Sequence, residues 1–184
     1  MNHVNEQMFN SLLDNRTIML TGEINDVSAE VVTMALLYLD AQAVAPIHLY
    51  INSCGGSVYA MNSIVDTMNL IKSPVHTYNI GLAASAAGII LLNGEKGHRY
   101  ATPNATTMLH QPIGGAEGSS MDVEIAVEQL KFIREKMFEF CSERTGKSVK
   151  QIKADLQRDR YFTAEQALKY GIIDVILKTD KGGK

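Results

Sequence analysis

The feature that most constrains the fold of this chain is an alternation between short apolar runs and longer segments with helical periodicity. Residues 17–21, 47–51 and 75–80 form apolar runs that predict strands, while residues 27–41 and 59–71 carry apolar side chains at helical spacing. The predicted order is therefore strand, helix, strand, helix, strand. Because these strands are apolar on both faces, we expect an α/β fold with a mostly parallel sheet covered by helices.

The length and composition of the chain fit one folded unit. A chain of 184 residues that is 46% hydrophobic is long enough to bury about 70% of its unfolded surface. No proline-rich, serine-rich or strongly charged linker interrupts the sequence, and no internal repeat is visible. We therefore expect a single domain over residues 1–184.

Charge and composition exclude several classes of partner and cofactor. The net charge is -3 and the only basic cluster is the short tail 178–184, so nucleic-acid binding is not expected. Cys54 and Cys141 are too few for a disulfide framework or a metal site, which favours reduced thiols, a cytoplasmic location and no metal or other cofactor. The polar N-terminus has no signal-peptide pattern, and no apolar stretch is long enough to span a membrane.

The longest helical pattern covers residues 121–145. The capping-box pair Ser119 and Asp122 precedes it and Gly146 ends it. A helix of about 25 residues is about 37 Å long. Its apolar stripe either packs only on its own domain or also contacts another subunit, and the length favours the second interpretation. The stripe consists of Val123, Ala126, Leu130, Ile133, Met137 and Phe140.

Three short segments contain the residue types of a hydrolytic site, and they are centred on Ser85, His110 and Asp159. A serine hydroxyl becomes a strong nucleophile only when an imidazole removes its proton and a carboxylate fixes the orientation of that imidazole. The three side chains therefore act only as a set. If they meet in space, the chain is a serine hydrolase.

The predicted positions of these residues fit such a site. Ser85 falls at a strand-to-helix turn, where helix amides without partners can bind an oxyanion. The amide of Ala86 is one candidate donor, and the amide of Gly56, which follows another predicted strand, is the second. His110 ends a strand-like run, and the capping-box patterns Ser148 with Gln151 and Thr163 with Gln166 place Asp159 near a helix end or in a loop.

None of these segments is specific by itself. The chain has eleven serines, and a serine in an alanine-rich turn more often serves helix packing than chemistry. The carboxylate of Asp159 fits a surface ion pair with Arg158 or Arg160 equally well.

The order and spacing of the motifs are more specific than any one motif. They resemble the proteolytic subunit of Clp proteases, the ClpP family, from about Leu12 to Leu177. The intervals of 25 residues from Ser85 to His110 and 49 from His110 to Asp159 are those of the family triad. An α/β-hydrolase instead runs Ser, Asp, His and needs G-x-S-x-G. The matching motifs are Ile51-Asn52-Ser53-x-Gly55-Gly56, Gly81-x-Ala83-Ala84-Ser85, Pro103-Asn104, Met108-x-His110-Gln111-Pro112, Arg158-Asp159-Arg160 and Ala167-x-x-Tyr170-Gly171.

The resemblance implies the ClpP/crotonase-type fold, a spiral of βαβ units from which a long handle helix, about 121–145, protrudes. It implies that Ser85 is the nucleophile, His110 the general base and Asp159 the orienting carboxylate, with Gly56 and Ala86 in the oxyanion hole. The handle would join two stacked heptameric rings of identical subunits. Substrates would be unfolded proteins and peptides, threaded into the chamber by a Clp-type AAA+ unfoldase, because the peptidase subunit itself binds no ATP. The residues that would line the substrate channel include Gly114 and Gly115.

The sequence departs from the family pattern where subunits and partners meet. Cys54 replaces the usual proline before the two glycines, a change that we expect the oxyanion hole to tolerate. Gln157 replaces an acidic residue that helps to pair the rings, so ring pairing is expected to be weaker. The segment before Leu12 is also shorter than the usual axial loop. The family's surface pocket for the ATPase is rich in aromatic residues. This chain retains Tyr50 and Tyr100 there but has His48 and Leu70 at two other matching positions.

Three other functions remain open from the sequence. A phage-type head-maturation protease shares the Ser85 motif and the two glycines, Gly55 and Gly56. A crotonase-like acyl-CoA enzyme shares the implied fold and oxyanion hole but needs no Ser–His–Asp set. A non-catalytic ring subunit is the third possibility, because a complete triad can stay misaligned until a partner orders it.

Overall fold

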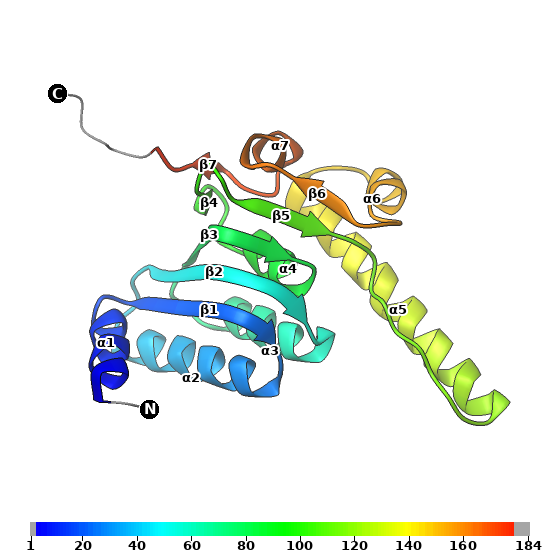
Figure 1. The fold of residues 1–184 in the computed structure, drawn as a ribbon, viewed down its shortest axis with the longest axis horizontal. Coiled ribbons are helices and arrows are strands. Elements are labelled where there is room, and N and C mark those ends of the chain that lie inside the picture. Colours follow the sequence, from blue (N-terminus) through cyan, green and yellow to red (C-terminus); the bar gives the residue numbers. More distant parts are fainter. Residues whose placement is uncertain (1–2, 179–184) are drawn as a thin grey trace.

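The computed structural model describes residues 3–178, so most of the basic tail 178–184 lies outside the described residues (Figure 1). Helices and strands alternate over residues 3–101, as the apolar runs predict. In order, the elements are α1 (His3–Asp14), β1 (Thr17–Ile24), α2 (Asp26–Gln42), β2 (Ile47–Gly56), α3 (Val58–Leu70), β3 (Val75–Ala84), α4 (Ala86–Leu92), β4 (Arg99–Ala101), β5 (Thr106–Leu109), α5 (Ser120–Thr145), α6 (Val149–Asp155), β6 (Arg160–Phe162), α7 (Ala164–Tyr170) and β7 (Val175–Ile176).

The sheet is mostly parallel, which confirms the predicted architecture. Its strands follow the order β1-β2-β3-β4-β7, and every neighbouring pair in this path is parallel. β5 also pairs with β3 in parallel, while β6 pairs with β5 in the antiparallel sense. This antiparallel pair was not predicted, and it brings the C-terminal third of the chain to the carboxyl end of β3.

β3 divides its partners between its two halves. Thr77 to Asn79 pair with β4, and Leu82 to Ala84 pair with β5. The fully buried Asn79 lies where the partner changes, and its amide group donates to the Thr106 carbonyl at 2.9 Å and to the Thr107 hydroxyl at 3.1 Å. The buried amide therefore replaces the ladder bonds lost at the division, as a buried polar group requires.

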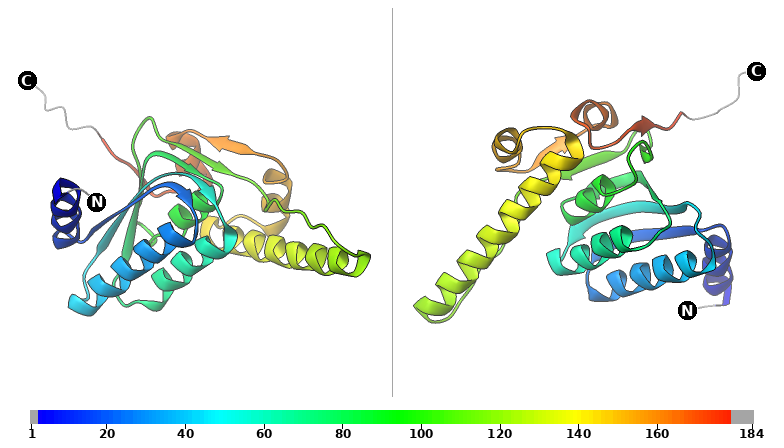
Figure 2. Two further views of the ribbon diagram at one scale, coloured as in Figure 1. Left: turned by 60° about the horizontal axis from the view of Figure 1, so that its bottom comes forward. Right: turned by 180° about the vertical axis from the view of Figure 1, so that it is seen from behind.

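The two faces of the sheet differ, contrary to the expectation that both are covered. Side chains of β2 alternate between buried Ile47, Leu49 and Ile51 and half-buried His48 and Tyr50. Helices α2, α3 and α4 pack on one face of the sheet. The right-hand view of Figure 2 shows these helices in front of the strands. The opposite face carries the aromatic side chains of β2, β3 and β4. One face of these strands therefore packs in the core, and the other, which we call the aromatic face, presents rings.

Helix α5 projects from the rest of the molecule (Figures 1 and 2). It has 26 residues, begins with a capping box between Ser119 and Asp122, and ends at Gly146 in the left-handed conformation, as predicted. Only Phe138 and Cys141, both in its C-terminal half, are buried. The predicted apolar stripe from Val123 to Phe140 is only half-buried, so the longer part of the helix is incompletely covered by its own chain. Within residues 3–178, neither α5 nor any other helix is long and apolar enough to cross a membrane.

Candidate active site

Ser85 occupies the turn between β3 and α4, as predicted from the sequence. It is the N-cap residue of α4 and has φ 55° and ψ -120°, a conformation that costs a non-glycine residue about 1–3 kcal/mol. Its backbone N–H donates to the Met108 carbonyl of β5 at 2.8 Å. The turn is thus fixed by β5, and it holds the hydroxyl at the end of the strand.

The pairing of β3 with β5 brings His110 to Ser85. Ala84 lies opposite Met108 in the parallel register, so the residue after Ala84 lies near the residues that follow β5. The Ser85 Oγ and the His110 Nε2 are 2.8 Å apart, and the imidazole is 12% exposed. This distance is that of a hydrogen bond and allows direct proton transfer.

The antiparallel pairing of β5 with β6 brings Asp159 to His110. Leu109 lies opposite Arg160, so His110 and Asp159 directly follow and precede paired residues. The Asp159 Oδ1 lies 3.6 Å from the His110 Nδ1, and the carboxylate is 56% exposed. The separation is too long for a hydrogen bond, although it allows an electrostatic contact. The alternative pairing with Arg160 is wrong, because Arg160 forms its ion pair with Asp155.

The glycine turn at the end of β2 contacts Ser85 through Gly55. Gly55 has φ 93°, and a Cβ atom there would lie 2.6 Å from the Ala84 carbonyl oxygen and 2.8 Å from the Ser85 Cβ. Only glycine permits this approach. Gly56 is the predicted oxyanion donor, whereas this contact of Gly55 is not among the predictions. Two adjacent glycines after a strand are the sequence signal that indicates such a close approach.

Gly56 and Ala86, the predicted oxyanion donors, lie on either side of this contact. Gly56 pairs with Ile24 of β1, while Ala86 begins α4. The first bond of α4 runs from the Ile89 N–H to the Ser85 carbonyl at 3.2 Å, so the Ala86 amide precedes the bonded amides of the helix. The buried Ser53 hydroxyl accepts from the Gly55 N–H at 3.1 Å and holds the glycine turn.

A mostly apolar pocket of about 420 Å³ opens beside Ser85 and His110. Its walls come from α3, α4 and α5, and it has the size and lining of a site for an apolar group. The apolar residues that line it are Val58, Met61, Val65, Ala86, Ile89, Pro112, Phe132, Ile133, Met137 and Phe140, and the polar ones are Asn62, Asp66, Asn69 and Lys136.

A second pocket, of about 380 Å³, separates the segment 112–116 from the side of α5. Gly114 and Gly115, the predicted channel residues, form part of its wall together with Leu130. A Cβ atom on Gly114 would lie 3.4 Å from the Leu130 Cδ1, so the backbone runs close to the helix. The two predicted residues therefore border a groove that adjoins the residues following His110.

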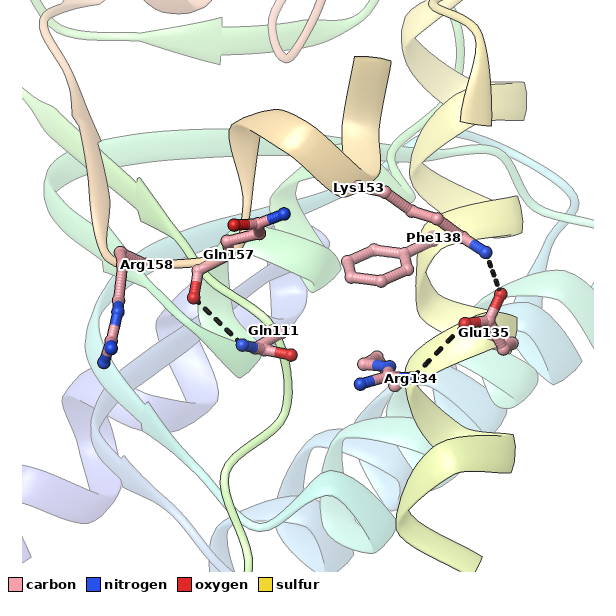
Figure 3. A pocket seen from close by; sticks show the side chains of 7 residues that line it. All are labelled: Gln111, Arg134, Glu135, Phe138, Lys153, Gln157 and Arg158. Atoms are coloured by element: carbon pink, nitrogen blue, oxygen red, sulfur yellow. Dashed lines mark hydrogen bonds and ion pairs between the residues drawn. The ribbon is translucent and has the colours of Figure 1, made fainter. Parts of the chain in front are cut away.

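A third pocket, of about 520 Å³, is lined by Gln111, which follows His110, and by Gln157 and Arg158, which precede Asp159 (Figure 3). Gln111 and Gln157 form one wall, and the Gln111 Nε2 donates to the Gln157 carbonyl at 2.9 Å. On the opposite wall, Lys153 of α6 is paired with Glu135 of α5. The other residues around the pocket are Arg134, Phe138 and Arg158.

The predicted docking residues lie on the aromatic face of the sheet, with one exception. The ring of Tyr78 stacks between Tyr50 at 4.5 Å and Tyr100 at 4.7 Å, and the His48 Nδ1 is 2.8 Å from the Tyr78 hydroxyl. Burial, with the neighbouring tyrosines, raises the pKa of Tyr78 to about 12. Leu70 belongs to a different element, as the last residue of α3, and is 79% exposed. Tyr78, at the centre of this stack, was not among the predicted residues.

Comparison with known protein families agrees with the arrangement of these residues. A family model described as Clp protease matches residues 2–180, nearly the whole chain. The α/β fold, the mixed sheet and the long projecting helix α5 are consistent with that family. The chain therefore belongs to the Clp protease family.

Proposed function

We propose that this Clp-family peptidase is a serine endopeptidase in which Ser85 is the nucleophile, His110 the general base and Asp159 the orienting carboxylate. The observation that supports this most directly is the 2.8 Å separation of the Ser85 Oγ and the His110 Nε2. As the Oγ attacks the peptide carbonyl, the Nε2 takes its proton and then gives it to the leaving amine. Water, activated by the same nitrogen, cleaves the acyl-enzyme and restores the Ser85 hydroxyl.

The oxyanion would be held by the amides of Ala86 and Gly56. The contact of Gly55 with Ser85 brings the end of β2 against the start of α4, so the two amides flank the nucleophile. Two fixed N–H donors stabilise the negative charge that develops on the carbonyl oxygen, and the loss of one such donor typically lowers the rate by about 10²–10³.

The apolar pocket beside Ser85 supports a preference for a large apolar side chain next to the cleaved bond. Its volume of about 420 Å³ and its lining by residues such as Met61, Ile89 and Phe132 suit leucine, methionine or phenylalanine side chains. An extended chain would continue along Gly114 and Gly115 through main-chain hydrogen bonds, which carry little sequence information. Unfolded proteins and peptides are therefore the proposed substrates.

Exposed apolar surfaces support the proposed homo-oligomer of two stacked heptameric rings. On α2, Val27, Met34 and Tyr38 are 71%, 56% and 55% exposed, and on α5 Met121 and Ile125 are 72% and 67% exposed. Apolar stripes of this kind on two separate helices favour contacts with other subunits. A Clp-type AAA+ unfoldase is the proposed partner at the aromatic face of His48, Tyr50 and Tyr100. The cytoplasmic location stays a prediction.

One observation favours dependence of activity on assembly. The 3.6 Å separation between Asp159 and His110, together with the exposure of the carboxylate, leaves the third member of the triad loosely held. A partner-dependent ring subunit would have this property. An isolated chain of low activity that becomes active in a ring, alone or with a second subunit type, would support this second candidate.

The proposal is tested by acyl-enzyme chemistry at Ser85. A fluorophosphonate probe reacts with an activated serine hydroxyl, so the wild-type chain should be labelled and Ser85→Ala should not. The measurement is intact-protein mass spectrometry after labelling, combined with a native mass to establish the assembly. Equal labelling of both proteins would end the proposal, and acyl-CoA binding without labelling would favour a crotonase-like enzyme.

A further inference from the structure

The segment that carries Asp159 is held at both ends by the segment that carries His110. On one side, Leu109 and Arg160 are paired in the β5–β6 ladder. On the other side, Gln111 donates twice, from its backbone N–H to the Leu156 carbonyl at 2.8 Å and from its Nε2 to the Gln157 carbonyl at 2.9 Å. His110 and Asp159 therefore lie between two sets of hydrogen bonds.

The anchor on the β6 side is redundant. Besides the ladder, Arg160 forms an ion pair with Asp155, and its guanidinium lies 5.1 Å from the centre of the Phe162 ring and 5.0 Å from that of Tyr170. The Tyr170 hydroxyl donates to Asp155 at 2.8 Å. Removal of one of these contacts leaves the others in place.

The anchor on the α6 side is much simpler. Leu156 is the C-cap residue of α6, and beyond it the chain is tied to the catalytic segment by the two bonds from Gln111. Only one of these bonds uses a side chain. In Figure 3 the Gln111 amide points across the pocket wall to Gln157, two residues before Asp159.

We propose that Gln111 is a positioning residue, whose side-chain amide holds the 156–159 segment so that Asp159 stays beside His110. The inference rests on the proposed Ser85–His110–Asp159 triad and adds a residue that acts through Asp159 without touching substrate. Because the His110–Asp159 separation already exceeds a hydrogen bond by several tenths of an ångström, a small movement of this segment decides whether the two groups interact.

The first test is Gln111→Met, which keeps the length of the side chain and removes its donor. We expect kcat for a small fluorogenic peptide to fall about three- to tenfold, the effect of one hydrogen bond, with KM unchanged. Gln157→Met is the matched control, because the bond from Gln111 ends on the backbone carbonyl of residue 157, which this change retains. The two variants and the wild type are compared only as particles of equal native mass.

The second test is a double-mutant cycle with Asp159→Asn. If Gln111 acts through Asp159, Gln111→Met will have no further effect on the residual rate of Asp159→Asn. An equal loss in both backgrounds, or an equal loss in Gln111→Met and Gln157→Met, would overturn the inference.

Gln111→Glu keeps the inference testable if the methionine variant does not fold. Its carboxylate has the shape of the amide but at pH 8 cannot donate to the Gln157 carbonyl, so kcat should fall at least as far. A wild-type chain without Ser85 labelling would defeat the proposed function itself, whereas an active wild type with fully active Gln111 variants would defeat only the role of Gln111.

Discussion

At the scale of single residues, the proposed site depends on two backbone conformations that most residues avoid. Ser85 has φ 55° and Gly55 has φ 93°, and the two residues touch. The small side chains of Ala84 and Ala86 leave room for this contact. A strained turn of this kind persists only when its surroundings fix it, here through the bond from the Ser85 N–H to β5.

Gly55→Ala should disable the site because the added methyl group collides with its neighbours, and not because alanine is strained at a positive φ. The new Cβ would lie within 3 Å of the Ala84 oxygen and the Ser85 Cβ, so the nucleophile must shift. A displacement of about 1 Å costs roughly 10²-fold in kcat/KM. Gly97→Ala is the control, because Gly97 has a similar φ of 90° with nothing within 4 Å of its Cβ position. A similar loss of activity in both variants would contradict the argument.

The proposed role of His110 predicts an acidic limb in the pH dependence of activity. A general base must be neutral, because a protonated imidazole cannot take the proton of the serine hydroxyl. Acylation of Ser85 should therefore slow as the pH falls from 8 to 5. The check is the initial labelling rate across this range, and a flat profile would count against His110 as base.

At the scale of elements, the sequence predicted the strands and helices that are long enough to show a local periodicity. Residues 47–51, 75–80 and 121–145 were predicted as two strands and a long helix, and the structure confirms them with the strands extended to Gly56 and Ala84. β6 and β7, of three and two residues, are too short for any periodicity. Their pairing is non-local, so the sequence alone could not show that β6 places Asp159 beside His110.

The capping predictions show the same limit. The box between Thr163 and Gln166 forms both of its bonds, whereas Ser148 only accepts from the Gln151 N–H, at 3.2 Å. A glutamine at this position allows a capping box but does not ensure it, because the side chain has other partners. Site residues were predicted from motif order, while their distances required the folded chain.

The histidines on the aromatic face of the sheet predict that stability falls on acidification. Burial, aided by Arg16, lowers the pKa of His48, and burial with His98 and His48 lowers that of His76, whose ring stacks on His98 at 4.0 Å. Neighbouring Glu95 opposes the shift of His76. The unfolded chain therefore binds protons more readily, so stability present above about pH 6.5 is lost as the pH falls.

The change that tests this is His76→Phe, which keeps an aromatic ring and removes the titration. The melting temperature of the wild type should fall by a few degrees between pH 7.5 and pH 5. The variant should lose less over the same interval, as measured by scanning calorimetry. An identical slope in the two proteins would show that His76 contributes nothing to the pH dependence.

At the scale of the whole molecule, the distribution of apolar surface predicts association. The exposed apolar side chains of α2, Val27, Met34 and Tyr38, form a stripe on the outer side of the helix. A charge in this stripe should weaken association between subunits, so Met34→Asp is expected to lower the native mass of the particle. Val44→Asp is the control, since Val44 is 65% exposed but follows the helix and lies outside the stripe. Native mass spectrometry at equal concentrations makes the comparison, and unchanged mass in both variants would remove α2 from the interface.

Because α5 projects from its own chain, the stability of its first turns should depend on assembly and therefore on protein concentration. Because Phe138 and Cys141 are the only fully buried residues of this helix, the half-buried turns from Ser120 to about residue 133 can open without disturbing the core. Their amide protons should exchange with solvent rapidly in a separated chain and slowly in an assembled one. Dilution would thus melt the start of a helix while the sheet that carries Ser85 keeps its protection.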